Sequence, residues 1–500
     1  MNKLLQKIRS GFVAEGRYSP AMTAVLLVIL IAFNGIAYAL TNYFGLYLYS
    51  SDTEKLTVSD ASQPLFEKLE QEQRRVEILF CMAEDELAVH DTGMFVYYTA
   101  KQLAEKYPEV LSLEYMNILT RVDSKGNRRT DKIESYKAAL AEGEVLRNTS
   151  VVFTYTSAAG RESYRVLTDS TSIGFASFFM LDSQGSAVAY QGEEVLTAMS
   201  LLSKDKESKK AYFTQYHGEI ADVSLTTLLF CAGYTIHVLN LRDAEVPEDC
   251  DLLVISSPQT DFEKGSGVRT EIERLETYVK SGGHLFVTTH SYLKNPLENF
   301  DAFLANYGFK TVRDASGSVG IVKDSISSIP TDAYTLVADY AEGALLTALA
   351  PQLEDRGGVV LCQTAALSLS KNAKPLLLAS SSSVLEADGK TVDRAGSYTL
   401  AAMTEVDGGG DIVLIPSVYL TATDAMTSNT YSNRTFIYGI IDALYEVEDL
   451  PYGCNVVSLM SDMLENLTAR AARIYTAIIF LIPTALAAFG FVYLRRRRNR

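Results

Sequence analysis

Cysteine is scarce in this chain, and the cysteine motifs of redox and zinc chemistry are absent. There are only Cys81, Cys231, Cys250, Cys362 and Cys454, an odd number that excludes a disulfide-based scaffold. No C-x-x-C occurs, so neither a redox motif nor a zinc knuckle is supported. Two of the five lie in apolar, strand-like runs where buried thiols are expected. A disulfide between Cys231 and Cys250 stays open.

Signatures of nucleotide-binding and hydrolytic sites are also missing. Gly265-Ser266-Gly267 has no Walker lysine and does not directly follow a strand, so it does not form a phosphate-binding loop. The strand candidate HLFVTT (284–289) runs into His290-Ser291, where a cysteine hydrolase would carry its nucleophile, and no G-x-S-x-G follows. We therefore predict no catalytic residue, no metal site and no cofactor.

Positive charge is in deficit over most of the chain. The formal net charge is −16, although basic residues gather at both ends. Proteins that bind nucleic acids need a basic surface, so a nucleic-acid partner is not expected. An acidic middle region also argues against lying flat on anionic lipid, and its simplest consequence is solubility.

Two long apolar runs lie near the ends. Residues 474–494 carry no charge and precede the arginine-rich tail 495–500, while residues 21–40 follow the basic segment 1–20. A helix of this length is about 30 Å long, which matches the hydrocarbon core of a bilayer, and basic flanks stay cytoplasmic. We expect two transmembrane helices in the plasma membrane, both termini cytoplasmic, and residues 41–473 extracytoplasmic. A signal peptide cleaved near Thr41 is the alternative for the first run.

Strand and helix patterns alternate through residues 52–203, which we expect to form one α/β domain. The order strand, helix, strand, helix and two paired strands, closed by a helix, is typical of a thioredoxin-like domain. The sequence AEDE at 83–86 stands where that fold would carry its redox motif. The predicted strands are 76–81, 111–118, 150–156 and 162–167, and the predicted helices are 94–107, 133–140 and 192–202.

Residues 211–447 predict a second α/β domain, separated from the first by a charged stretch at 203–210. Short apolar strands alternate with amphipathic helices, which indicates a doubly wound parallel sheet of amidotransferase-like type. Thr270 and Glu273 predict a capping box at the start of one helix. The predicted strands are 211–213, 234–239, 252–255, 284–289, 359–363, 376–380, 398–403 and 411–416, and the predicted helices are 223–231, 270–280 and 435–445.

Polar residues follow three of these strands. Because parallel sheets bind ligands at the carboxyl ends of their strands, these positions are candidates for contacts with a ligand or a partner. Each also has an ordinary interpretation as a structural turn or loop. The candidates are His217, Gly218, Glu219, Gln259, Thr260, Asp261 and His290.

The same segments carry a family resemblance. LTVSDAS (56–62), HGE (217–219), PQTDF (258–262) and YVKSGGHLFV (278–287) resemble, in this order along nearly the whole chain, the gliding-motility-associated (GldG-like) auxiliary family of ABC transporters. The chain departs from the family at Tyr216, where glycine is usual, and in an insertion around 264–268.

The resemblance implies a non-catalytic, membrane-anchored auxiliary subunit that works beside an ABC ATPase and a multi-span permease. Its outer domains would bind a partner or an extracellular ligand. Two alternatives stay open. One is a surface hydrolase with a degenerate amidotransferase-like domain that uses His217, Glu219 or His290, and the other is a module that binds a sugar or a peptide.

Overall fold

The computed structural model describes residues 56–459 apart from short gaps. The gaps are 124–125, 129, 141–142, 169–173, 183–184, 203–207, 221, 264–268, 292, 294–295, 330–331, 354–355, 395, 418, 422, 446 and 448. All described residues belong to one compact unit that begins at Leu56. The division into domains at 52–203 and 211–447 stays a prediction.

The first sheet has the strand order β3-β2-β1-β4-β5. β1 runs parallel to β2 and antiparallel to β4, and β4 and β5 form the predicted hairpin. Helix α6 buries one face that includes Val96, Ala100 and Leu103, residues with the three- and four-residue spacing of an amphipathic helix. The elements are α4 (Gln63–Gln71), β1 (Arg75–Phe80), α5 (Glu84–Leu87), α6 (Gly93–Lys106), β2 (Leu111–Asn117), β3 (Val122–Asp123), α7 (Thr130–Ala138), β4 (Val151–Thr156), β5 (Glu162–Leu167) and α8 (Gly192–Leu201).

A small sheet of order β23-β7-β6 is formed by strands that are far apart in the sequence. Its strands are β6 (Phe179–Leu181), which follows the short 3₁₀ helix η1 (Ala176–Phe178), β7 (Ala187–Tyr190) and β23 (Val457–Ser458). The pairing of Val457 with Tyr190 ties the end of the described chain back to its first third.

The second sheet contains the parallel core that the sequence predicts. Its neighbouring strands β9, β8, β10, β11 and β22 all pair in parallel. The predicted capping box is confirmed, because Thr270 and Glu273 bond each other's backbone N–H groups at the start of α10. The elements are β8 (Lys209–Thr214), α9 (Val223–Cys231), β9 (Tyr234–Leu239), β10 (Leu252–Ser256), α10 (Glu271–Lys280), β11 (His284–Thr288), β22 (Asp411–Ile415) and α14 (Asn433–Tyr445).

Beyond β22 the sheet is antiparallel, which the sequence did not predict. β21 pairs antiparallel with β22, β18 with β21, and β15 with β18. Two parallel neighbours need a long crossover connection, usually a helix. The connection from β18 to β21 contains only the two short strands β19 and β20, so antiparallel pairing is expected there. The added elements are α11 (Glu298–Asn306), β12 (Phe309–Thr311), β13 (Ile321–Lys323), β14 (Ser328–Ile329), β15 (Asp332–Tyr340), α12 (Ala344–Leu349), η2 (Ala350–Gln352), β16 (Val359–Cys362), β17 (Leu367–Leu369), β18 (Lys374–Leu378), β19 (Val384–Ala387), β20 (Lys390–Asp393), β21 (Thr399–Glu405) and α13 (Thr423–Thr427).

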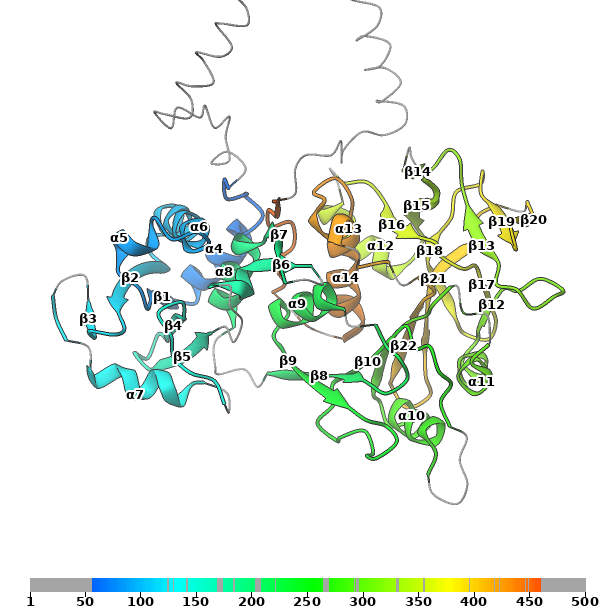
Figure 1. Ribbon diagram of the computed structural model, residues 1–500, viewed down its shortest axis with the longest axis horizontal. Helices are drawn as coiled ribbons and strands as arrows, with labels where there is room; N and C mark the ends of the chain where they lie inside the picture. Colours follow the sequence, from blue (N-terminus) through cyan, green and yellow to red (C-terminus); the bar gives the residue numbers. More distant parts are fainter. Residues whose placement is uncertain are drawn as a thin grey trace, which may run out of the picture. The chain divides into compact units, whose positions relative to one another are not determined.

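Helices cover both faces of the parallel strands. Val254 and Phe286 share one hydrophobic core with residues of α9 and α14, whereas Leu253 and Val287 share another with residues of α10 and α11. Successive residues of a strand point to opposite faces, so the continuous apolar run LLVI supplies both cores. Figure 1 shows α9 and α10 on opposite sides of β8 and β10. Sequence and structure therefore agree on an α/β architecture.

The membrane assignment needs correction. Within the described part of 56–459, no helix has both the length and the apolar character needed to cross a bilayer. The two predicted spans, 21–40 and 474–494, fall outside the described residues. The expected placement in the plasma membrane, with cytoplasmic termini and residues 41–473 outside, is thus contradicted by this finding, and we do not carry it further.

All five cysteines are free thiols, so Cys231 and Cys250 do not pair. Burial raises the pKa of Cys81 and of Cys250 to about 12. These thiols are protonated at neutral pH and act as small apolar groups.

Candidate functional site at the carboxyl edge of the parallel strands

His217 lies in the loop after β8 and is completely buried between two carboxylates. Its Nδ1 lies 3.2 Å from Glu219 Oε1, and its Nε2 lies 3.0 and 3.1 Å from the two oxygens of Glu271. The ring stacks on Phe262 with centroids 3.9 Å apart. Glu271 is the first residue of α10, where the helix dipole favours a negative charge. The loop after β8 is thereby joined to the start of α10.

The two carboxylates favour the charged form of this imidazole. Burial alone lowers the pKa of His217, but the hydrogen bonds and negative charges of Glu219 and Glu271 outweigh burial and raise it. Burial raises the pKa of Glu219, but the hydrogen bonds from His217 and from backbone N–H groups outweigh it, and the net shift is downward. His217, Glu219 and Glu271 form a buried ion triplet.

The second predicted segment packs directly on the first. The backbone N–H groups of Gln259 and Thr260 both donate to the carbonyl of His217, at 2.7 and 2.9 Å. The Gln259 amide donates to the Gly218 carbonyl at 2.9 Å. Gly218 has a φ of 72°, and an added Cβ would lie 3.2 Å from Gln259, so glycine suits this turn. The structure therefore brings together two segments that the sequence could only place at the same edge.

Asp261 supplies the N-terminal cap of α11 from a distant part of the chain. Its carboxylate accepts hydrogen bonds from the backbone N–H groups of Asn299 and Phe300, at 2.9 and 3.1 Å. The residue before the helix, Leu297, has no side chain that could do this. A carboxylate at this point satisfies N–H groups that a helix leaves unpaired.

His290 lies just beyond β11, in the position that a nucleophile would occupy in an amidotransferase-like fold. Its ring is partly buried, and burial lowers its pKa, so the imidazole is neutral at neutral pH. The hydroxyl of the next residue, Ser291, is buried and has no hydrogen-bond partner among the described residues. A serine nucleophile needs a base within hydrogen-bond reach, and the structure shows none at Ser291.

Sequence reasoning missed Glu271, the second carboxylate on His217. The two residues are 54 positions apart, and Glu271 looks like an ordinary acidic residue in the first turn of a helix. Its near-complete burial, 3% exposed, is what distinguishes it, and burial of a single residue cannot be read from a helical pattern. Arg242, 3.7 Å from Glu271, adds a further charge at the rim.

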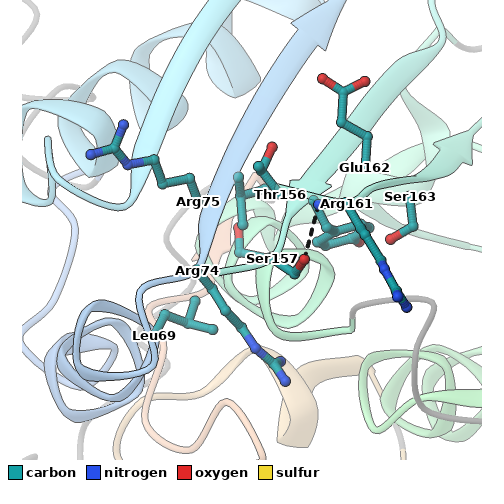
Figure 2. A pocket seen from close by; sticks show the side chains of 11 residues that line it. Leu69, Arg74, Arg75, Thr156, Ser157, Arg161, Glu162 and Ser163 are labelled. Carbon is teal, nitrogen blue, oxygen red and sulfur yellow. Dashed lines mark hydrogen bonds between the residues drawn. The ribbon is translucent and has the colours of Figure 1, made fainter. Parts of the chain in front are cut away.

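A small hollow lies at the edge of the first sheet, away from these residues (Figure 2). Its volume is about 130 Å³, and Arg74, Arg75 and Arg161 are among its lining residues. The side chains of Arg74 and Arg75 extend in opposite directions in Figure 2. The backbone N–H of Arg161, not its guanidinium, donates to the Ser157 hydroxyl at 3.1 Å. The arginines do not converge on one point, so this hollow is a poor anion site.

A second hollow, of about 470 Å³, lies where the thioredoxin-like fold would carry its redox motif. Glu84 and Asp85 of AEDE line it together with Tyr97 and Tyr115. The Tyr97 hydroxyl donates to Glu84 at 2.9 Å. The polar lining of this hollow therefore consists mainly of carboxylates and phenols, and no cysteine is among its described lining residues.

A buried ion pair joins α8 to α14. Arg434 Nη2 lies 2.5 Å from Glu194 Oε1, and the two side chains are 7% and 1% exposed. The Tyr438 hydroxyl donates to the same carboxylate at 2.6 Å. Burial lowers the pKa of Arg434, but the charge of Glu194 outweighs it, so the guanidinium stays charged. The cluster is buried, and although Arg434 Nε has no hydrogen-bond partner among the described residues, the ion pair fits a structural role.

No protein-family model and no curated protein matches the chain. Solved structures share partial similarity with it. The N-terminal domain of mmIFT52 has 18% identity and a TM-score of 0.36, covering 48% of this chain and 99% of that one. PurLQS from Thermotoga maritima has 14% identity and a TM-score of 0.30, covering 48% and 100%. A ThuA-like protein from Bacteroides uniformis has 10% identity and a TM-score of 0.31, covering 49% and 95%. All three scores are below 0.5, so these similarities decide nothing about function.

Proposed function

We propose that this chain is a non-catalytic auxiliary subunit of an ABC-type transport system and binds a partner or a ligand through its α/β sheets. The GldG-like family resemblance names the system, with an ABC ATPase and a multi-span permease as partners. The proposal of a non-catalytic role rests on the polar residues at the edge of the second sheet, which bond to the protein itself. There, the polar residues of 217–219 and 259–261 bond to one another and to helix N-termini.

Two further features support a binding role. The chain has no Walker lysine in its only candidate phosphate loop, so ATP hydrolysis would belong to another subunit. In the parallel core the strand that would present a nucleophile, β11, ends at Thr288 and is followed by Thr289 and His290. In this proposal the first sheet is thioredoxin-like and the second amidotransferase-like, both serving as binding scaffolds.

The hydrolase alternative is disfavoured by geometry. His217 is inaccessible, with 0% of its side chain exposed, and Glu219 is 8% exposed. A general base must reach a bound substrate, and these two groups reach only each other and α10.

Affinity purification of the full-length tagged chain from its own cells, in mild detergent, tests the proposal. We expect an ATPase and a multi-span permease to co-purify, and their amounts to rise and fall together under salt washes. The same tag on an unrelated protein from those cells is the control. Recovery of the chain with neither subunit would overturn the transporter assignment.

A further inference from the structure

The largest of the described hollows lies over the carboxyl end of β11, and nothing above assigns it a role. Its volume is about 740 Å³. It is bounded by the segment after β11, the loop before β13 and the turn between β19 and β20. Parallel sheets present ligands at this edge, and ligand sites occupy roughly 300–1,000 Å³. Its polar lining includes Ser291, Arg313, Ser318, Tyr334, Glu386 and Asp388.

One polar group in this wall is unsatisfied. The Ser291 hydroxyl is buried, with the residue 4% exposed, and has no hydrogen-bond partner among the described residues. An unpaired buried hydroxyl costs about 1–3 kcal/mol, so proteins rarely leave one without a reason. A ligand hydroxyl in the hollow would supply the missing partner.

Two of the three charged groups of the lining, Arg313 and Glu386, already have partners of opposite charge, whereas Asp388 accepts from the Ser318 hydroxyl at 2.8 Å. Arg313 Nη2 lies 3.4 Å from Asp301, and its Nη1 donates to the Gly317 carbonyl at 3.1 Å. Glu386 accepts from Lys323 at 3.0 Å and from the Tyr334 hydroxyl at 2.6 Å. An anion would therefore find the Arg313 guanidinium already paired, and a cation would find Glu386 already paired, which favours a neutral ligand that bonds these groups through hydroxyls.

Hydrogen-bonding capacity nevertheless remains on both groups. A guanidinium has five N–H donors and a carboxylate about four acceptor positions, and the contacts above use only part of each. Val319, Ile321 and Leu293 add apolar surface, and Tyr334 adds an aromatic ring. Donors, acceptors and apolar surface together match the alternating hydroxyl groups and C–H faces of a sugar.

We infer that this hollow binds a neutral, polyhydroxylated ligand the size of a mono- or disaccharide. Glu386 and Arg313 would bond its vicinal hydroxyls, and Ser291 would bond a further one at the base. The inference rests on the proposed binding function and names a ligand class for it. It does not involve the ion triplet at His217.

Isothermal titration of the purified full-length chain, separately with maltose, cellobiose and N,N′-diacetylchitobiose, tests the site. Spermidine and glutamate, used alone, are the charged probes. We expect at least one disaccharide to bind with a Kd in the millimolar range or below, and neither charged probe to bind. Failure of all three sugars at saturating concentration, or binding of a charged probe only, would overturn the assignment.

Two variants place the binding in the hollow. Glu386→Gln should weaken binding about tenfold and Ser291→Ala about fivefold, as expected for lost charged and neutral hydrogen bonds. Ser291→Ala should leave the melting temperature of the free protein unchanged or higher, because it removes an unpaired hydroxyl. Asp393→Asn, exposed on β20 of the same small sheet, is the matched control and should bind as the parent does.

Equal affinity in Ser291→Ala and in the parent would contradict the site even if Glu386→Gln failed to fold. The titration uses the isolated chain, so its failure leaves the co-purification result standing. Conversely, sugar binding without an ATPase or a permease would overturn only the transporter assignment.

Discussion

At the scale of single residues, the most unusual group is the buried imidazolium of His217. Because the folded-state pKa of His217 is raised above its usual 6.5, its stabilising effect is complete below about pH 6.5 and is lost as pH rises through the raised value. The folded-state pKa of Glu219 is lowered from 4.5, so its effect is present above about pH 4.5 and is lost below that. Both contributions are complete between these two values.

We therefore expect the free energy of unfolding to fall as pH rises above 6.5, and His217→Gln to remove most of that dependence. Urea titrations followed by circular dichroism from pH 5 to pH 9 would measure both slopes. His237→Gln is the control and should keep the parent's slope, because His237 is only half-buried and its ring lies against Tyr212 rather than between carboxylates. A parent protein whose stability does not change over this range would show that His217 is not held charged.

Tyr216 precedes this histidine with a φ of 85°, a backbone region that favours glycine, and its side chain is 61% exposed. The family resemblance places glycine here. We expect Tyr216→Gly to raise the free energy of unfolding by about 0.5–1 kcal/mol, because strain is relieved and little packing is lost.

Tyr216→Ala separates backbone strain from side-chain effects, since alanine keeps the Cβ. It should show little or none of the gain in denaturant titrations. If alanine and glycine stabilise equally, the backbone explanation fails.

At the scale of elements, α11 depends on a residue from another segment. Asp261→Ala removes the acceptors for the N–H groups of Asn299 and Phe300, and should cost about 1–2 kcal/mol of unfolding free energy. Asp261→Asn keeps one oxygen acceptor and should cost less. Hydrogen exchange at residues 298–303 should rise in the alanine variant, and unchanged exchange there would argue against the cap.

The helices with local signals were predictable from the sequence. α9 and α10 match the predicted 223–231 and 270–280, because their end signals are local: Gly233 follows α9, and Thr270 and Glu273 cap the start of α10. The strands β13, β15 and β19 and helix α11 were missed. The three strands pair with strands from distant parts of the chain. α11 has apolar residues at helical spacing but no capping side chain at Leu297, and its cap comes from Asp261.

At the scale of the whole molecule, the ion pair of Glu194 with Arg434 connects α8 to α14, two helices that are far apart in the sequence. Arg434→Met leaves a buried carboxylate without its counter-charge and should cost about 3–5 kcal/mol of unfolding free energy. The double variant Glu194→Met with Arg434→Met should recover much of this loss. Urea unfolding followed by circular dichroism would measure all three proteins.

Lys68→Met is the matched control. Its ion pair with Asp449, at 2.6 Å, also joins distant parts of the chain but is partly exposed, so its loss should cost at most about 1 kcal/mol. If Lys68→Met and Arg434→Met lowered the unfolding free energy by similar amounts, burial would not explain the larger contribution expected of the Glu194–Arg434 ion pair.

The sequence by itself determined the α/β class, the parallel core strands, the capped helices and the lack of nucleotide or redox motifs. These depend on residues that are neighbours along the chain, such as Thr270 and Glu273. Tertiary structure decided the rest. Only folding pairs His217 with Glu271, caps α11 with Asp261 and forms the hollow lined by Ser291 and Glu386, because burial and charge pairing arise between segments that are far apart in sequence.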